Sequence, residues 1–572
     1  MTSSALSLWA PLSIAPLTLL AAFVWFRNGQ VERIVRLILL AVALLAAIGS
    51  LWLTGEPTIL SPRLSWLPIP GAGPPITMGI RVDAVTSGLT LAVALLSWVT
   101  LAALPAGWRR TDTVLLLTAS TAAHMAIIGD HLLLRLAAIE GLLLSVVLLI
   151  ADRRTIASLL VTQRLAAGAL LLAGLILGWP DASTHFPQIE RVEAWVPLLV
   201  MLAILALGGA LPFHRSLRPL AAQSAAPRAH VSALLLLVSG GLSLQLAGQL
   251  DPMPTTLTTV GLAVTAGVAA IMSLVALDAG RAQLWMWASQ LGFALAVTLH
   301  ADAAVAVSLW ICLALVRPAA AQALDIVQAA LGDEPFAARR WGGLAGSLPV
   351  ACGLSVLAGV AVVALPPFGL FATLAHLLAP LPLGDPDSLP LIGAALFVVL
   401  PALRLGLWPF IGASRRSVLA PQEQTSVPRW VAATTAGSAV IGFLWPVSQL
   451  LTAHLPPTPV IGASAILVFG LLLISVLLGR RRRPELGDGQ VSPWRNVVDQ
   501  GLPLPSHLRR WVLAVLRRVA WFIDLLGLLP ALVTGLLRAS AWMLAWIESR
   551  PLWWAGAGMV GLIAALLLGG SK

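Results

Sequence analysis

Three residue types that often carry chemistry are scarce in this sequence: tyrosine is absent, lysine occurs once, as Lys572, and cysteine occurs twice. Without tyrosine, no catalytic or redox phenol is available. Cys312 and Cys352 lie inside apolar runs without a CxxC or Cys/His spacing, which argues against a disulfide framework, a zinc site and an iron–sulfur cluster. The chain also has no G-x-G-x-x-G on a predicted strand, so it lacks the means to bind NADH or carry electrons alone. We therefore expect no metal and no cofactor.

Charge is also scarce, because charged residues make up 10% of the 572 residues whereas 59% are hydrophobic. This balance excludes a soluble domain. A helix needs about 20 apolar residues to span a bilayer, and runs of this length recur often enough to predict about sixteen spans. The runs are too long for barrel strands, and lipid offers no partner for an unpaired amide. The sequence therefore predicts an all-α polytopic membrane protein.

The formal net charge of +11 would suggest nucleic-acid binding in a soluble protein. Here the arginines lie in loops and at helix ends, which is typical of orientation by positive charge on the cytoplasmic side. We therefore expect a multi-pass protein of a bacterial inner membrane, in contact with the lipid bilayer and not with nucleic acid. The first apolar run, residues 8–26, lacks a basic lead-in and is expected to stay as the first span.

Apolar runs and polar stretches divide the chain into five segments. They are an N-terminal hairpin with an extramembrane loop at 1–82, a transmembrane core at 83–411, additional spans at 412–479, a polar linker with a surface helix at 480–551, and an anchor helix at 552–572. Proline-rich stretches at 212–227 and 365–367 predict broken helices within the core. Breaks at two corresponding places are typical of inverted repeats around an ion path.

The surface helix is predicted from the mixture of arginine, tryptophan and leucine at 508–547, interrupted at Pro530. A segment with one polar and one apolar side lies along the membrane surface or against partners. The preceding run of four arginines, 480–483, places that end of the adjoining span on the cytoplasmic side. We therefore predict a lateral amphipathic helix followed by the anchor helix.

Four stretches in the core together resemble a known family. They are Gly129-Asp130-His131-Leu132-Leu133-Leu134 leading to Glu140; Leu211-Pro212-Phe213-His214 with Val231-Ser232-Ala233-Leu234-Leu235; Asp278 and Arg281 with Ser289-Gln290-Leu291-Gly292-Phe293; and Gly342-Gly343-Leu344 with Leu365-Pro366-Pro367-Phe368. In order and spacing they resemble the antiporter-like membrane subunits shared by respiratory complex I, membrane-bound hydrogenases and multi-subunit cation/proton antiporters. The predicted lateral helix is similar to that of the largest such subunit of complex I, the subunit L type of NADH-quinone oxidoreductase.

The resemblance implies an antiporter-like subunit of an ion-translocating, proton-moving complex, with other membrane subunits as partners and the redox or other chemistry in those partners. At most, such a chain is a subunit of a translocase, with no redox site of its own. Two alternatives stay open. One is the membrane subunit of an energy-coupled inorganic-carbon pump, which pairs with a zinc-containing cytoplasmic protein. The other is a structural subunit that keeps the fold without conducting.

Glu140 is the first candidate for a proton path, because a carboxylate inside a span is costly unless it has a role. Apart from Glu140, Gly141 and Ser145, every residue of 136–149 is apolar. We expect this carboxylate to face the bundle or a water path near mid-membrane. The alternative is a structural role, in which Glu140 is the partner of Arg135 or Arg164.

The lysine relay that the resemblance implies is degenerate in this chain, since Arg317 and leucines occupy its lysine positions. Arginine keeps its proton at any accessible pH, so Arg317 can supply a fixed charge but cannot relay a proton. Histidine exchanges protons near neutrality, which makes His376, His230 and His124 candidates, although each can equally be a structural histidine. Gln290 could hold a water in a polar chain.

The pair Asp278 and Arg281 is expected near a helix end. At such a position, an ion pair or a solvated loop explains both charges without a functional role. We therefore predict a structural ion pair there, and no catalytic residue in the chain.

Overall fold

The structure, a computed structural model, describes residues 58–67, 76–104, 108–150, 153–178, 195–211, 213–246, 255–276, 278–331, 343–363, 377, 388–411 and 431–441. The predicted first two spans, the surface helix and the anchor helix lie outside the described residues. So do His376 and the break predicted at 365–367. The count of about sixteen spans and the inverted repeats stay predictions.

Helices dominate the described part of the chain. In chain order the elements are β1 (Thr58–Leu67), β2 (Ile76–Val82), α3 (Ala84–Ala103), α4 (Arg110–Ile128), α5 (Leu132–Leu149), α6 (Arg153–Gly178), α7 (Trp195–Gly208), η2 (His214–Leu217), α8 (Arg218–Ala221), α9 (Ala225–Leu246), α10 (Thr255–Val275), α11 (Ala279–Thr298), α12 (Ala303–Leu331), α13 (Pro349–Val363) and α15 (Ser388–Gly406). Among the described residues, seven helices are long and apolar enough to cross a membrane: α3, α4, α5, α9, α10, α12 and α15. The predicted helical membrane fold is confirmed to that extent.

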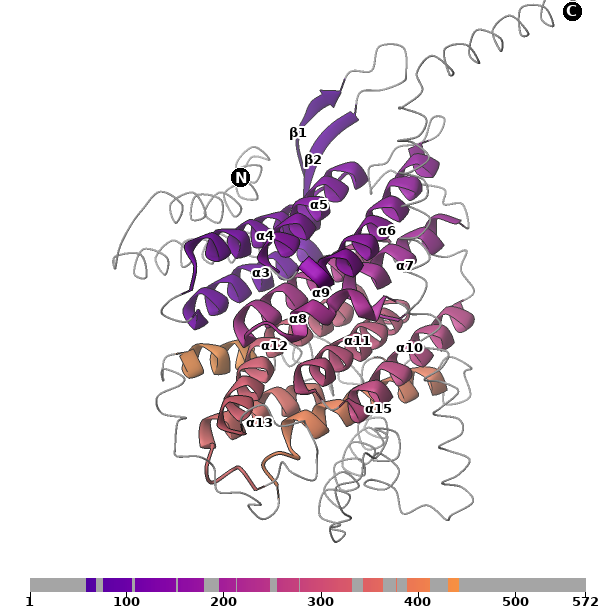
Figure 1. Ribbon diagram of the computed structural model, residues 1–572. Helices are drawn as coiled ribbons and strands as arrows, with labels where there is room; N and C mark the ends of the chain where they lie inside the picture. Colours follow the sequence, from indigo (N-terminus) through magenta and orange to yellow (C-terminus); the bar gives the residue numbers. More distant parts are fainter. Residues whose placement is uncertain are drawn as a thin grey trace, which may run out of the picture.

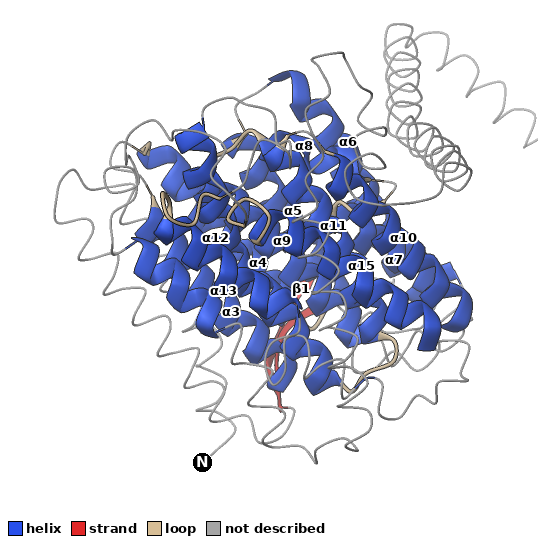
Figure 2. Ribbon diagram, turned by 90° about the horizontal axis from the view of Figure 1, so that it is seen from below, coloured by secondary structure: helices blue, strands red, loops and turns tan. Residues whose placement is uncertain are grey.

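The long helices lie side by side in one bundle, with the two strands at its edge (Figure 1). The same bundle is seen from below in Figure 2. Helix α9 packs against α3, α4, α7, α11 and α12, and α12 packs against α3, α11 and α13. Nearly every residue of α11 is buried, which is typical of a helix surrounded by others. Helices α9, α11 and α12 therefore form the centre of the core.

Polar side chains fix where several of these helices begin. Asp83 precedes α3 and accepts a 2.7 Å hydrogen bond from the amide of Thr86, whose hydroxyl accepts from the amide of Asp83 at 2.8 Å. This reciprocal pair satisfies two amides that a helix start leaves without partners. His131 caps α5 in a similar way by accepting from the amide of Leu133.

The predicted interruption after α7 is present. Helix α7 ends at Gly208, and Gly209 has a φ of +65°, where a side chain is disfavoured. Leu217 of η2 packs so closely on Gly209 that a Cβ atom there would overlap its side chain. The short helices η2 and α8 then lead to α9, so the long helices are interrupted where the proline-rich sequence predicted a break.

The hairpin β1–β2 was predicted as a loop, and the structure corrects this. The strands are antiparallel, with Thr58 opposite Val82, and their pairing shifts between Leu60 and Leu64, where Pro62 has no amide to donate. A bridge from Ile80 to Gly129 joins the hairpin to the turn between α4 and α5. The apolar residues at every second position of 76–82 were the signal for a strand.

Close packing in the core gives a first prediction. A Cβ atom at Gly240 of α9 would lie 2.7 Å from the ring of Trp310, which is itself fully buried. Gly240→Ala should lower the melting temperature in detergent, because overpacking costs about 1–3 kcal/mol. The control is Gly261→Ala on α10, where a Cβ meets open space and the better helix propensity should leave stability equal or higher. Equal melting temperatures for the two variants would contradict the packing.

Candidate functional site

Glu140 of α5 pairs with Arg164 of α6, and the distance from Oε2 to Nη1 is 2.7 Å. The carboxylate side chain is 29% exposed and the guanidinium side chain 60% exposed on the isolated chain. The ion pair therefore lies on the side of the bundle rather than deep inside it, unlike the expectation for Glu140. Of its two possible structural partners, the structure selects Arg164.

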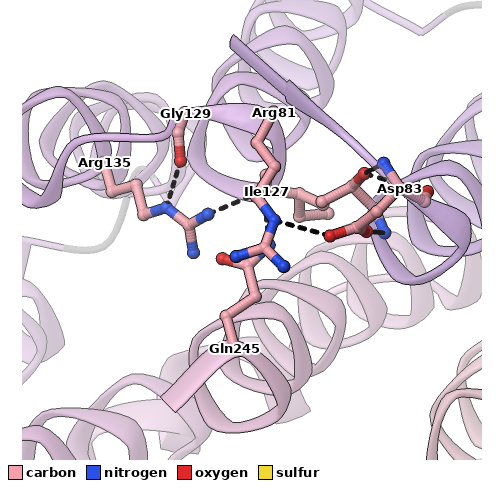
Figure 3. A network of polar contacts seen from close by, with 7 residues as sticks. Arg81, Asp83, Ile127, Gly129, Arg135 and Gln245 are labelled. Atoms are coloured by element: carbon pink, nitrogen blue, oxygen red, sulfur yellow. Dashed lines mark hydrogen bonds and ion pairs between the residues drawn. The ribbon is translucent and has the colours of Figure 1, made fainter. Parts of the chain in front are cut away.

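Arg135, the other possible partner of Glu140, is fully buried and donates hydrogen bonds to main-chain carbonyls instead (Figure 3). Its Nε donates to the carbonyl of Gly129 at 2.5 Å, and its Nη2 donates to that of Ile127 at 3.2 Å. The side-chain amide of Gln245, at the end of α9, also donates to Ile127 at 3.4 Å. These carbonyls belong to the end of α4, where free acceptors and the helix dipole favour a cation.

A second arginine lies beside this network. Arg81 of β2 forms a 2.6 Å ion pair with Asp83, the residue that caps α3 (Figure 3). The hairpin, the start of α3, the turn from α4 to α5 and the end of α9 thus meet at one polar cluster. Its hydrogen bonds hold the start of α5, and with it the helix that carries Glu140.

His230 of α9 is buried between two hydroxyl groups from other helices. Its Nδ1 lies 2.9 Å from Thr100 Oγ1 of α3, and its Nε2 lies 2.8 Å from Ser120 Oγ of α4. Ser97 of α3 donates to the Ser120 hydroxyl at 2.9 Å. Hydroxyls both donate and accept, and the tautomer of the ring decides which of them donates to it. The row from Thr100 to Ser97 is therefore a continuous hydrogen-bonded chain through one histidine.

His124 lies one helical turn beyond Ser120 on α4 and is also buried. His124 thus shares a helix and a buried position with Ser120.

Arg317 of α12 is buried beside a small cavity. Its Nη1 donates to the carbonyl of Ser232 on α9 at 2.5 Å, and its guanidinium lies 5.0 Å from the ring centre of Trp287 on α11. A cation over a tryptophan face is attracted by the ring electrons. Gln290 of α11 also lines this cavity, so the structure brings Gln290 and Arg317 together as neighbours.

Asp278 and Arg281 lie at the start of α11. Asp278 is the N-cap, and its Oδ1 accepts from the amide of Arg281 at 2.8 Å. Its Oδ2 lies 4.0 Å from Arg281 Nε, and both side chains are about half exposed. The carboxylate stabilises the helix start chiefly through the backbone amide, since exposed ion pairs contribute little.

The structure thus distributes the candidates over separate places. Glu140 lies between α5 and α6, and His230 lies between α3, α4 and α9. Arg317 and Gln290 line the cavity between α11, α12, α13 and α15. The remaining candidate His376 lies outside the described residues.

Sequence reasoning missed several buried polar contacts. Arg228 of α9 forms a 2.5 Å ion pair with Asp325 of α12, which also accepts from the amide of Ala225 at the start of α9. Arg404 of α15 donates to the carbonyls of Ser273 and Ala276 at the end of α10. A single arginine within an apolar run was the available signal, because it must find acceptors in the bundle.

Comparison with known proteins finds the fold among solved structures. No family model matches the chain, and no curated protein matches it. A chain of respiratory complex I from Thermus thermophilus, determined with bound aureothin, is 19% identical with a TM-score of 0.60, over 77% of this chain and 99% of that chain. A chain of the Mrp complex from Dietzia sp. DQ12-45-1b is 17% identical with a TM-score of 0.68, over 99% of this chain and 63% of that chain.

A third similar structure is a chain of the membrane-bound sulfane sulfur reductase, an archaeal respiratory membrane complex. It is 15% identical with a TM-score of 0.66, over 97% of this chain and 99% of that chain. The resemblance predicted from the four motifs is confirmed at the level of the fold, which this chain shares with chains of three multi-subunit membrane complexes.

The hydroxyl chain gives a second prediction. Ser120→Ala removes the partner of His230 Nε2, and an unsatisfied buried polar group costs about 1–3 kcal/mol. The melting temperature, followed by near-ultraviolet circular dichroism in detergent, should fall. Thr118→Ala is the control, because this hydroxyl lies on the exposed side of α4 and bonds only within its own helix. Equal loss in both variants would show that the His230 contact does not stabilise the fold.

Proposed function

We propose that this chain is an antiporter-like subunit of a proton-translocating membrane complex in a bacterial inner membrane. The observation that carries the proposal is the ion pair of Glu140 and Arg164 between two apolar helices of a fold that respiratory and Mrp complexes share. Ionisable residues within spans usually mark an ion path or a proton relay. The redox or other driving chemistry belongs to partner subunits.

Glu140 is the proton-binding group in this proposal. A carboxylate that loses its cation partner in apolar surroundings binds a proton, and it releases the proton when the partner returns. The Arg164 guanidinium is the partner that can move, because its side chain is 60% exposed. A movement of α6 relative to α5 would therefore couple conformation to proton binding.

Deeper in the bundle, the proposal replaces the lysine relay with histidine and hydroxyl groups. His230, with Thr100 and Ser120, offers groups that both accept and donate a proton. Arg317 keeps its charge and sets the local potential without exchanging protons. His124 and His376 remain further candidates for exchange.

The exposure of the Glu140–Arg164 ion pair also supports contact with partner subunits. Leu144 and Leu148 of α5 are 55% and 59% exposed on the same helix as Glu140, and Leu175 of α6 is 60% exposed. A charged pair facing lipid would be costly, whereas a neighbouring membrane subunit would shield it. We infer that the face formed by α5 and α6 contacts another subunit.

Proton flux tests the central proposal. In vesicles that contain the purified chain or its complex and a pH-sensitive dye, Glu140→Gln should abolish flux, because the amide keeps the shape but does not ionise. Arg317→Lys should retain part of the flux, since the positive charge survives. Asp302→Asn is the control, an exposed carboxylate just before α12.

Unchanged flux in Glu140→Gln vesicles would refute the relay. Wild-type vesicles no more permeable to protons than protein-free vesicles would favour the structural-subunit alternative.

The inferred contact face is tested by association. Leu144→Arg should reduce the recovery of other membrane subunits with the chain in mild detergent, because a desolvated, unpaired charge at an interface costs several kcal/mol. Val264→Arg is the control, an equally exposed position on α10, which packs mainly on α11 and α15. Full recovery with Leu144→Arg would place the partner on another face.

A further inference from the structure

The cavity beside Arg317 has an unusual balance of charge. Residues of four helices line it, and its volume is about 30 Å³. Gln283, Trp287, Gln290, Arg317 and Ser355 are among its lining residues, and the other lining residues are apolar. One of these residues is a cation and none is acidic. The cavity is therefore positive and otherwise mostly apolar.

The positive charge of Arg317 has no counter-charge in the part of the chain that the structure describes. None of the ion pairs there includes it, and Asp325, two turns further along α12, is bound to Arg228. Arg317 is 4% exposed, and its Nε has no hydrogen-bond acceptor among the described residues. A buried cation without an anion is costly, and the contacts to one carbonyl and to Trp287 leave its net charge unchanged.

Two buried amides face the same space. Gln283 and Gln290 are 1% and 2% exposed, and the side-chain oxygen of each lacks a hydrogen-bond partner. A half-turn of either amide presents its NH₂ group in place of the oxygen. The cavity can thus present N–H donors from the guanidinium and from two amides.

We propose that this cavity binds one small monovalent inorganic anion of about the size of chloride, held by Arg317 Nε and the amide N–H groups of Gln290 and Gln283. A water needs about 10–15 Å³ of such a cavity, so the space holds about two water-sized particles, such as chloride with one water. The mostly apolar walls lower the local dielectric constant and strengthen the attraction between anion and guanidinium. Water alone would satisfy the hydrogen bonds but leave the charge uncompensated.

Equilibrium dialysis with radioactive chloride tests the site directly and needs no transport assay. The full-length chain in lipid nanodiscs, in halide-free gluconate buffer, should bind one chloride per chain in a saturable manner, with displacement by bromide. Arg317→Gln should abolish this binding. Arg281→Gln should leave it unchanged, because this arginine is half exposed at the start of α11 and does not line the cavity.

A second variant keeps the cation. Gln290→Leu removes one donor and should weaken chloride binding about tenfold, the equivalent of one hydrogen bond to an ion. If the Arg317→Gln protein does not fold, the Gln290→Leu protein decides whether the cavity binds chloride. Absence of saturable binding to the wild-type chain, or binding unaffected by either substitution, would overturn the proposal and leave water as the occupant. Proton flux plays no part in these outcomes, so the site and the proposed transport function can fail independently.

Discussion

The cost of burying a guanidinium within a bundle of apolar helices governs much of this structure. Arg135, Arg228, Arg317 and Arg404 are each nearly or fully buried, and each donates to at least one main-chain carbonyl of another helix or of a helix end. Arginine suits this role because its planar group carries five donors and keeps its charge. Where a helix ends or bends, unpaired carbonyls supply the acceptors that such a group needs.

This constraint links the breaks of the helices to the places where charge can lie. Arg135 serves the end of α4 and Arg404 the end of α10. Arg317 is followed by Pro318, which removes one helical hydrogen bond inside α12, and Ser438 donates to the nearby carbonyl of Leu315 at 2.7 Å. This chain has a single lysine, and its buried arginines are fixed charges. In another protein, the same interior positions could carry residues that titrate.

The sequence predicted what depends on local patterns. Apolar run lengths located the membrane helices, proline marked the break before α9, and the spacing of motifs indicated the fold. Contacts between distant segments had no such signal: Arg228 and Asp325 are 97 residues apart, and Ser120 lies 110 residues from His230. The side exposure of Glu140 was missed because an apolar run shows that a carboxylate needs a partner but not which helix supplies it. The four apolar residues at every second position of β2 were a usable signal for a strand. The surrounding prolines and glycines made the segment look like a loop.

The charge of Arg317 bears on how a proton could cross the centre of the bundle. A permanent positive charge repels an approaching proton by about 4 kcal/mol at 4 Å, even with an effective dielectric constant of 20. A lysine at the same place could release its own proton and remove this barrier, whereas an arginine cannot. A bound anion would cancel most of the repulsion without any titration of the side chain. With such an ion beside Arg317, the polar groups of α11 and α12 would face a nearly neutral site.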